Sequence, residues 1–142
     1  MEIIVQLASC RRSLFSDDHS RKYYLEVICQ ATIQIMSATS AYLRCQDTYT
    51  QFCRLLVALK ANYQLNDLVK LKSYEMWIDH ISRFTINSFM DWENTGHSLH
   101  YLITLWARLT MSIPYVRGDV PTFLDSWVPR VCQSFAIGFL IV

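Results

Sequence analysis

The sequence contains few residues that break helices and few patterns that mark a chemical site. Only three glycines and three prolines occur among 142 residues, so turns should be few and the elements between them long. Three scattered glycines cannot form a Walker-type or dinucleotide-binding phosphate loop. None of the five cysteines belongs to a C-x-x-C pair, which argues against a zinc ribbon or a redox motif. We expect reduced thiols, as in cytosolic or nuclear proteins.

Long apolar runs and blocks of like charge are also absent. The longest apolar stretch, "FAIGFLIV" at residues 135–142, is far shorter than the roughly 20 residues of a membrane helix. The N-terminus "MEIIVQLASCRR" places its acid before its basic residues, the reverse of a signal peptide. The net charge of +1 gives no electrostatic footprint for nucleic acid. The sequence therefore predicts neither a membrane nor a nucleic-acid partner.

What the chain does contain is core-forming residues. Apolar residues make up 52% and charged residues 18%, and the length suits one domain over residues 1–142. Apolar positions recur at i, i+3 and i+4 spacing, whereas strand-like alternation is nowhere convincing. We therefore predict an all-α protein, with N-caps at Asp47, Ser73 and Thr95 or Ser98 and with Pro121 in the first turn of the last helix. The expected helices cover residues 2–13, 17–39, 47–63, 73–92, 95–114 and 121 onward, the last kinked or divided by Pro129.

The apolar positions repeat at a fixed offset of 50 residues. Six apolar positions in one predicted helix are matched by apolar residues fifty positions later. Four apolar positions in another predicted helix are matched by apolar residues both fifty and one hundred positions later. The first set pairs Tyr49, Phe52, Leu55, Leu56, Leu59 and Tyr63 with Leu99, Leu102, Leu105, Trp106, Leu109 and Ile113. The second set is Tyr24, Val27, Ile28 and Ala31, then Tyr74, Trp77, Ile78 and Ile81, then Leu124, Trp127, Val128 and Val131.

A repeating two-helix unit is typical of a HEAT or armadillo-like α-solenoid, whose usual period is about 40 to 47 residues. Longer loops account for the longer period here. A four-helix bundle is the alternative, but it has no reason to keep a common offset. We expect about two and a half to three helical hairpins. The last helix would then lack a partner, leaving the array uncapped at the C-terminus.

Two blocks carry a resemblance to a known family. "YTQFCRLLVALKANYQLNDLV" at residues 49–69 and "HSLHYLITLWARLTMSIPYV" at residues 97–116 resemble a segment of the exportin-7 and Ran-binding protein 16/17 group. Trp92 and "SLF" at residues 13–15 also fit, so the resemblance covers about residues 13–132. These proteins are nuclear transport receptors of the importin-β superfamily, and they are far longer than this chain. The tail "SFAIGFLIV" departs from the polar continuation that the family pattern leads us to expect.

The resemblance implies a binding and transport function rather than catalysis. It implies a nuclear export receptor that binds Ran in its GTP form, carries protein cargo and contacts nucleoporin repeats. Such a receptor shuttles through the nuclear pore between nucleus and cytoplasm. It uses no cofactor and no metal and is not an enzyme. The alternatives are a general helical-repeat interaction scaffold, or a helical-bundle protein without transport activity.

Candidate chemical sites are weak when read from the residues alone. His97 and His100 are spaced to share a helix face and bind zinc, but no fourth ligand accompanies them, and polar residues of a helix–helix turn explain them better. No glycine pattern marks a nucleophilic serine. Trp77, Trp92, Trp106 and Trp127 have helical spacing among aliphatic residues, which favours a core role over ligand stacking. We therefore predict no catalytic, cofactor-binding or metal-binding residue.

The remaining candidate is an interaction face. Opposite the apolar stripe of residues 47–63 lie Thr50, Arg54, Ala58 and Ala61, and fifty residues later lie His100, Thr104, Arg108 and Thr110 or Met111. The second helix of a HEAT unit usually lines the concave side. We therefore expect Arg54, His100 and Arg108 to project from neighbouring rungs into one partner-binding groove. A solvated face with incidental charge is the alternative.

Overall fold

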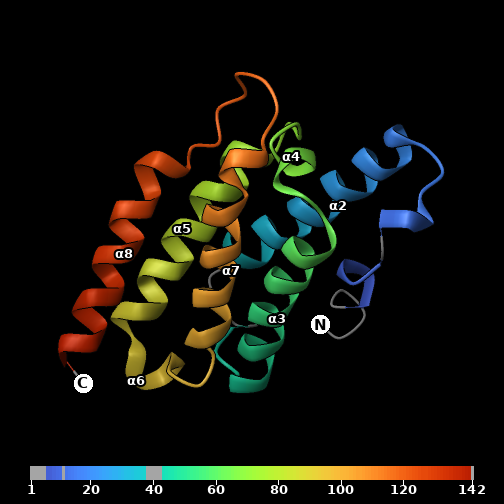
Figure 1. The fold of residues 1–142 in the computed structure, drawn as a ribbon. Helices are drawn as coiled ribbons and strands as arrows, with labels where there is room; N and C mark the ends of the chain where they lie inside the picture. Colours follow the sequence, from blue (N-terminus) through green and yellow to red (C-terminus); the bar gives the residue numbers. More distant parts are fainter. Residues whose placement is uncertain (1–5, 11, 38–42, 142) are drawn as a thin grey trace.

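The fold consists of helices stacked in two layers. The computed structural model describes residues 6–10, 12–37 and 43–141. Helices α2 (Asp18–Ser37), α5 (Tyr74–Met90) and α8 (Leu124–Ile141) pack side by side in one layer. Helices α3 (Gln46–Asn62) and α7 (Leu99–Ser112) pack against each other in the second layer, as Figure 1 shows. No strand occurs in the described part of the chain, so the all-α, HEAT-like prediction is confirmed.

Short helical turns connect the long helices. They are η1 (Arg12–Leu14), α4 (Leu65–Leu68), α6 (Trp92–Thr95) and η2 (Ile113–Tyr115). The single helix expected over residues 2–13 is wrong in its last part, because the chain leaves the helix at Ser9 and Cys10 before η1 begins. Residues 1–5 and 11 of that prediction lie outside the described residues, as do 38 and 39 of the next.

The core follows the predicted repeat closely in the second layer. All six predicted apolar positions of α3 are buried, and Leu102, Leu105, Trp106 and Leu109 are buried in α7. Trp77 and Trp127 are also buried, which confirms their core role, whereas Trp92 is half-buried. Val27 is the exception in the first layer, with 48% of its surface exposed. Helix α2 instead buries Leu25, Ile28, Cys29, Thr32 and Ile33.

Several predicted helix starts differ from the observed ones. Helix α3 begins at Gln46 with Cys45 at its N-cap, so Asp47 lies in the first turn, where the helix dipole also favours an acid. Ser73 stands at the N-cap of α5, but its side chain caps nothing. The carboxylate of Glu26 on α2 accepts the backbone N–H groups of Lys72 and Ser73, at 3.0 Å each. A neighbouring helix therefore supplies this cap.

The prolines act differently from one another. Helix α7 ends at Ser112, two residues before Pro114, as predicted. Pro121 does not lie in the first turn of α8, which begins at Leu124 after Phe123 adopts a φ of 58°. Pro129 lies inside α8 without dividing it. It is exposed and stands sixth in the helix, so α8 continues past it without the one hydrogen bond that a residue there would donate to the Asp125 carbonyl.

Candidate partner-binding face on α3 and α7

The first turns of α3 and α7 are joined by side-chain hydroxyl groups. Thr50 Oγ1 lies 2.9 Å from Ser98 Oγ. The hydroxyl groups of Tyr49 and Ser88 also form a hydrogen bond, and Thr95 Oγ1 donates to the Ser88 carbonyl at 2.5 Å. Thr50 was expected on the outward face and instead faces the neighbouring helix. The Thr50–Ser98 bond joins α3 to the residue before α7, whereas the other two attach α3 and α6 to α5.

The three predicted partner-binding residues all reach the surface to some degree. Arg54 is exposed on α3, and His100 is exposed in the first turn of α7. The His100 ring lies against that of Tyr101, with 4.0 Å between ring centroids. Arg108 is half-buried on α7. Within the described part of the chain, none of these three side chains forms an ion pair.

The structure brings Arg108 close to a lysine that the sequence reasoning missed. Lys60, on the last turn of α3, is only 8% exposed. Burial lowers the pKa of the Lys60 ammonium, and the nearby charge of Arg108 lowers this pKa further. Lys60 and Arg108 therefore place two positive charges close together on α3 and α7.

The sequence gives only a weak indication that Lys60 belongs to this site. It follows Leu59 and stands four residues after Leu56, so it borders the apolar stripe of α3. Its equivalent fifty residues later is Thr110, which is half-buried. A lysine at the edge of an apolar stripe usually extends its charged end into water. Here the stem of the side chain is covered, and the charged end reaches the cleft described next.

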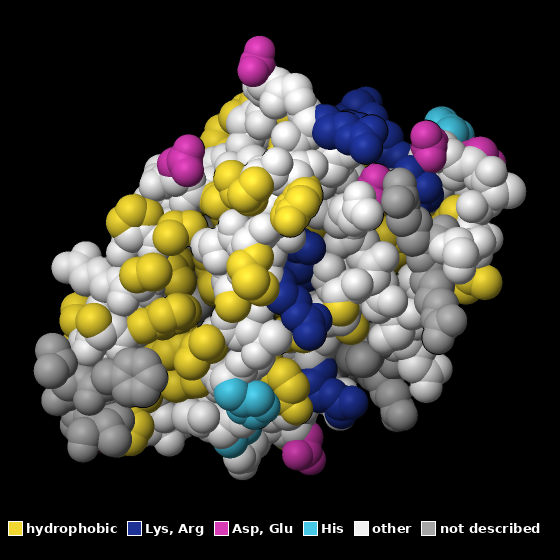
Figure 2. Space-filling view, viewed as in Figure 1, with side chains coloured by type: hydrophobic (Ala, Val, Ile, Leu, Met, Phe, Trp, Pro, Cys, Tyr) yellow, Lys and Arg dark blue, Asp and Glu magenta, His cyan; other side chains and the backbone are white. Residues whose placement is uncertain are grey.

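A cleft opens beside Lys60, where the last turns of α3 and α7 meet the loops that follow. The Asn66 side-chain oxygen accepts the backbone N–H of Arg117 at 3.1 Å and so ties α4 to the loop that follows η2. Figure 2 shows Lys and Arg atoms gathered along the boundary between α3 and α7. The residues that line the cleft are Lys60, Gln64, Leu65, Asn66, Ser112, Pro114, Tyr115, Val116 and Arg117.

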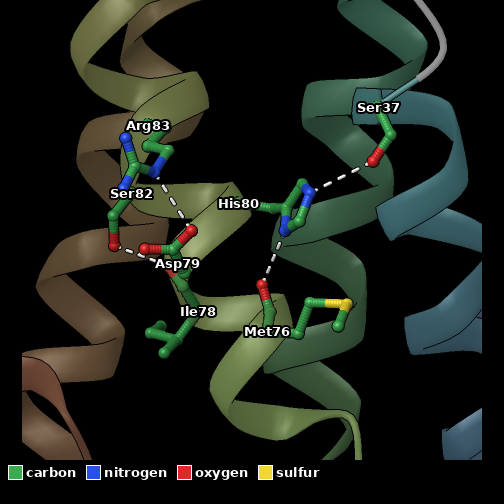
Figure 3. A network of polar contacts seen from close by, with 7 residues as sticks. All are labelled: Ser37, Met76, Ile78, Asp79, His80, Ser82 and Arg83. Carbon is green, nitrogen blue, oxygen red and sulfur yellow. Dashed lines mark hydrogen bonds and ion pairs between the residues drawn. The ribbon is translucent and has the colours of Figure 1, made fainter.

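A separate polar network lies in the first layer, on α5 (Figure 3). His80 Nδ1 donates to the Met76 carbonyl at 2.8 Å, while Nε2 lies 3.1 Å from Ser37 Oγ on α2. Arg83 pairs with Asp79 at 3.0 Å, and its guanidinium lies 5.6 Å from the ring centroid of Trp127 on α8. These contacts join α5 to both neighbours. They hold the layer together and form no catalytic arrangement of acid, base and nucleophile.

The two histidines considered as zinc ligands face different surroundings. The His97 ring lies edge-on to Tyr49, with centroids 6.2 Å apart, whereas His100 lies against Tyr101. Across residues 6–10, 12–37 and 43–141, no group of three or more His, Cys, Asp or Glu residues could hold a metal ion. Over the same ranges, no helix is long and apolar enough to cross a membrane.

Comparison with known proteins finds relatives of one kind. Exportin-7-B of Xenopus laevis is 39% identical over 135 residues, which is 95% of this chain and 12% of that protein. Ran-binding protein 17 of Homo sapiens is also 39% identical over 135 residues, with the same shares covered. Ran-binding protein 16 of Drosophila melanogaster is 36% identical over 132 residues, 93% of this chain and 12% of that protein.

Neither a family model nor a solved structure matches the chain. The chain spans 12% of the length of these curated relatives, whereas the similarity spans 95% of the chain. Both sequence blocks, residues 49–69 and 97–116, lie on the α3 and α7 layer that carries the candidate face. The chain is therefore homologous, along nearly all of its length, to the exportin-7 and Ran-binding protein 16/17 group, the family that these two blocks resemble.

Proposed function

We propose that the chain acts as a helical-repeat segment of an exportin-type nuclear transport receptor. In this role it contributes to binding Ran in its GTP form and protein cargo. The observation that carries the proposal is the identity of 36–39% over 93–95% of the chain to proteins named exportin-7 and Ran-binding protein. The further steps, contact with nucleoporin repeats and shuttling between nucleus and cytoplasm, follow from the same proposal.

The stacked-helix architecture suits a role that depends on binding rather than catalysis. In a stacked helical array each unit contacts mainly its neighbours, so the array can flex and wrap a large partner surface. The single domain over residues 1–142 would contribute about two and a half to three such units, and its outward face on α3 and α7 would carry the contacts. Arg54, His100 and Arg108 are the residues proposed to meet the partner, because Arg54 and His100 are exposed and Arg108 is half-buried on these two helices.

The test is a binding measurement on a complete receptor that contains this segment. Binding to Ran–GTP, to Ran–GDP and to an acidic cargo would be measured for wild type and for Arg54→Glu combined with Arg108→Glu. Exposed interface charges contribute through complementarity and association rate, so reversing two of them should weaken binding at least about tenfold. Lys22→Glu, at an exposed position of α2 in the other layer, is the matched control.

The expected result is preference for Ran–GTP over Ran–GDP, loss in the double variant and wild-type affinity in the control. Circular dichroism must show that the variants remain folded. A folded double variant with unchanged affinity for both partners would assign this segment to a spacer role. A complete receptor that binds neither form of Ran would leave only a general interaction scaffold.

A further inference from the structure

The Lys60 side chain is largely buried and borders a cleft, and it has no acidic partner among the described residues. Only 8% of its surface is exposed, and none of the ion pairs in the described chain includes it. Its ammonium nitrogen is not among the buried polar atoms of the described chain that lack a partner, so the charged end opens toward water, as the ends of lysine side chains usually do. The cleft therefore presents a positive charge without an acidic partner to an incoming ligand.

A second positive charge lies close to Lys60. Arg108 on α7 is close enough for its positive charge to oppose protonation of Lys60. Lys60 also stands in the last turn of α3, where the helix dipole favours a cation. Burial and the charge of Arg108 both lower the pKa of Lys60. An anion placed beside the ammonium would reverse this balance.

The cleft beside Lys60 has the shape and chemistry to accept such an anion. Neither aspartate nor glutamate is among the described residues that line it. Gln64 and Ser112 provide polar groups, while Leu65, Pro114 and Val116 provide an apolar wall. We propose that this cleft binds the carboxylate side chain of an acidic peptide segment, with the Lys60 ammonium as its ion-pair partner. That the segment belongs to a transported or regulatory protein rests on the proposed function; the binding site itself does not.

The position of the cleft favours a carboxylate over a phosphate. Phosphate sites are typically built from backbone N–H groups at helix N-termini or from several arginine side chains, whereas one arginine, Arg117, lines this cleft. This cleft lies beside the C-terminal ends of α3 and α7, whose free carbonyl groups carry partial negative charge. A doubly charged phosphate is repelled more strongly there than a singly charged carboxylate. The apolar wall also suits the methylene groups of a glutamate side chain.

The experiment measures binding of a capped hexaglutamate peptide to the 142-residue chain by isothermal titration calorimetry at low salt. Hexaglutamine serves as the uncharged control peptide, and inorganic phosphate is titrated separately. Lys60→Met removes the charge but keeps the length and apolar character of the side chain. Lys22→Met removes an exposed lysine of α2 and is the matched control variant.

We expect the wild type to bind hexaglutamate and not hexaglutamine, and phosphate at least tenfold more weakly than hexaglutamate. Lys60→Met should weaken hexaglutamate binding at least about tenfold, while Lys22→Met should bind as wild type does. Equal binding by Lys60→Met and wild type would overturn the proposal. So would tighter binding of phosphate than of peptide, or the absence of any binding by the wild type.

A second measurement keeps the proposal testable if Lys60→Met does not fold. In the wild type, the NMR signal of the Lys60 side-chain ammonium should shift on adding hexaglutamate and stay unchanged with hexaglutamine. An unshifted signal would reject the site. These outcomes can be told apart from the outcome of the Ran-binding test. If the complete receptor binds Ran–GTP but the cleft does not bind hexaglutamate, only the cleft proposal is contradicted. If the chain binds hexaglutamate but the complete receptor does not bind Ran, only the proposed transport role is contradicted.

Discussion

The groove between α3 and α5 is filled, whereas its repeat, between α7 and α8, is open. Helix α7 lies in the first groove, where Trp106 Nε1 donates to Thr85 Oγ1 at 2.8 Å and Ser98 meets Thr50. Fifty residues on, the second groove has no helix across it within the described chain. Figure 2 shows hydrophobic side chains gathered over this region, beside α8. Its lining includes Leu99, His100, Ile103, Phe135 and Gly138.

The two grooves occupy equivalent positions but differ in chemistry. Subtracting 50 from those five lining residues gives Tyr49, Thr50, Cys53, Thr85 and Ser88. In the filled groove the hydroxyl groups at Thr50, Thr85 and Ser88 all form hydrogen bonds. Their equivalents in the open groove are His100, Phe135 and Gly138, of which neither Phe135 nor Gly138 has a polar side chain. The repeat therefore preserves the shape of the array, while the polar contacts that fix each helix are particular to each groove.

The largest expected effect comes from emptying the filled groove. Trp106 is 3% exposed and Leu56 is fully buried, so Trp106→Ala and Leu56→Ala should each lower the free energy of unfolding by about 2 to 5 kcal/mol. Urea denaturation followed by circular dichroism measures the loss. Trp92→Ala, which truncates a half-buried residue of the open groove, is the control and should cost clearly less. Equal losses in Trp106→Ala and Trp92→Ala would contradict the difference between the grooves.

A smaller effect is expected from removing one hydrogen bond in the filled groove. Thr85→Val leaves the indole N–H of Trp106 without its acceptor, which should cost about 1 to 3 kcal/mol. Thr104→Val is the matched control, because the Thr104 hydroxyl bonds only the His100 carbonyl on its own helix. The same urea titration compares the two. If Thr85→Val proves as stable as Thr104→Val, the indole bond does not fix α7.

The smallest effect on stability, within about 0.5 kcal/mol, is expected from Ile103→Glu in the open groove. Ile103 is 38% exposed there, so a glutamate can reach water. The same change should instead alter association, since an exposed apolar groove favours contact between molecules. We expect wild type to self-associate in light scattering and Ile103→Glu to do so less. A wild-type chain that stays monomeric at high concentration would be inconsistent with this.

The sequence predicted the parts of the fold that depend on side-chain periodicity. Stripes at i, i+3 and i+4 located α3, α5 and α7, and the common offset placed equivalent helices in the same layer. Pro114 located the end of α7 because proline cannot continue a helix interior. These signals are local, or they repeat along the chain. The number of repeats remains a prediction.

Contacts between distant segments were the parts that the sequence could not show. Glu26 caps α5 from α2, more than forty residues earlier in the chain, so the start of α5 depends on tertiary packing. Val27 is exposed because α2 buries a stripe centred on Ile28 and Cys29. In the sequence, Lys60 resembles an ordinary surface lysine, and only the packed structure shows that most of its side chain is covered. The cleft likewise depends on the bond between Asn66 of α4 and Arg117 of a later loop.

The register of α7 in the groove between α3 and α5 can be measured directly by NMR. In the two-layer array the indole proton of Trp106 lies beside the side chain of Thr85, because Nε1 and Oγ1 are 2.8 Å apart. We predict a strong nuclear Overhauser effect between that indole proton and the Thr85 methyl group, with slow exchange of the indole proton with water. An indole proton that exchanges freely and shows no contact with Thr85 would contradict the repeat register and the two-layer array built on it.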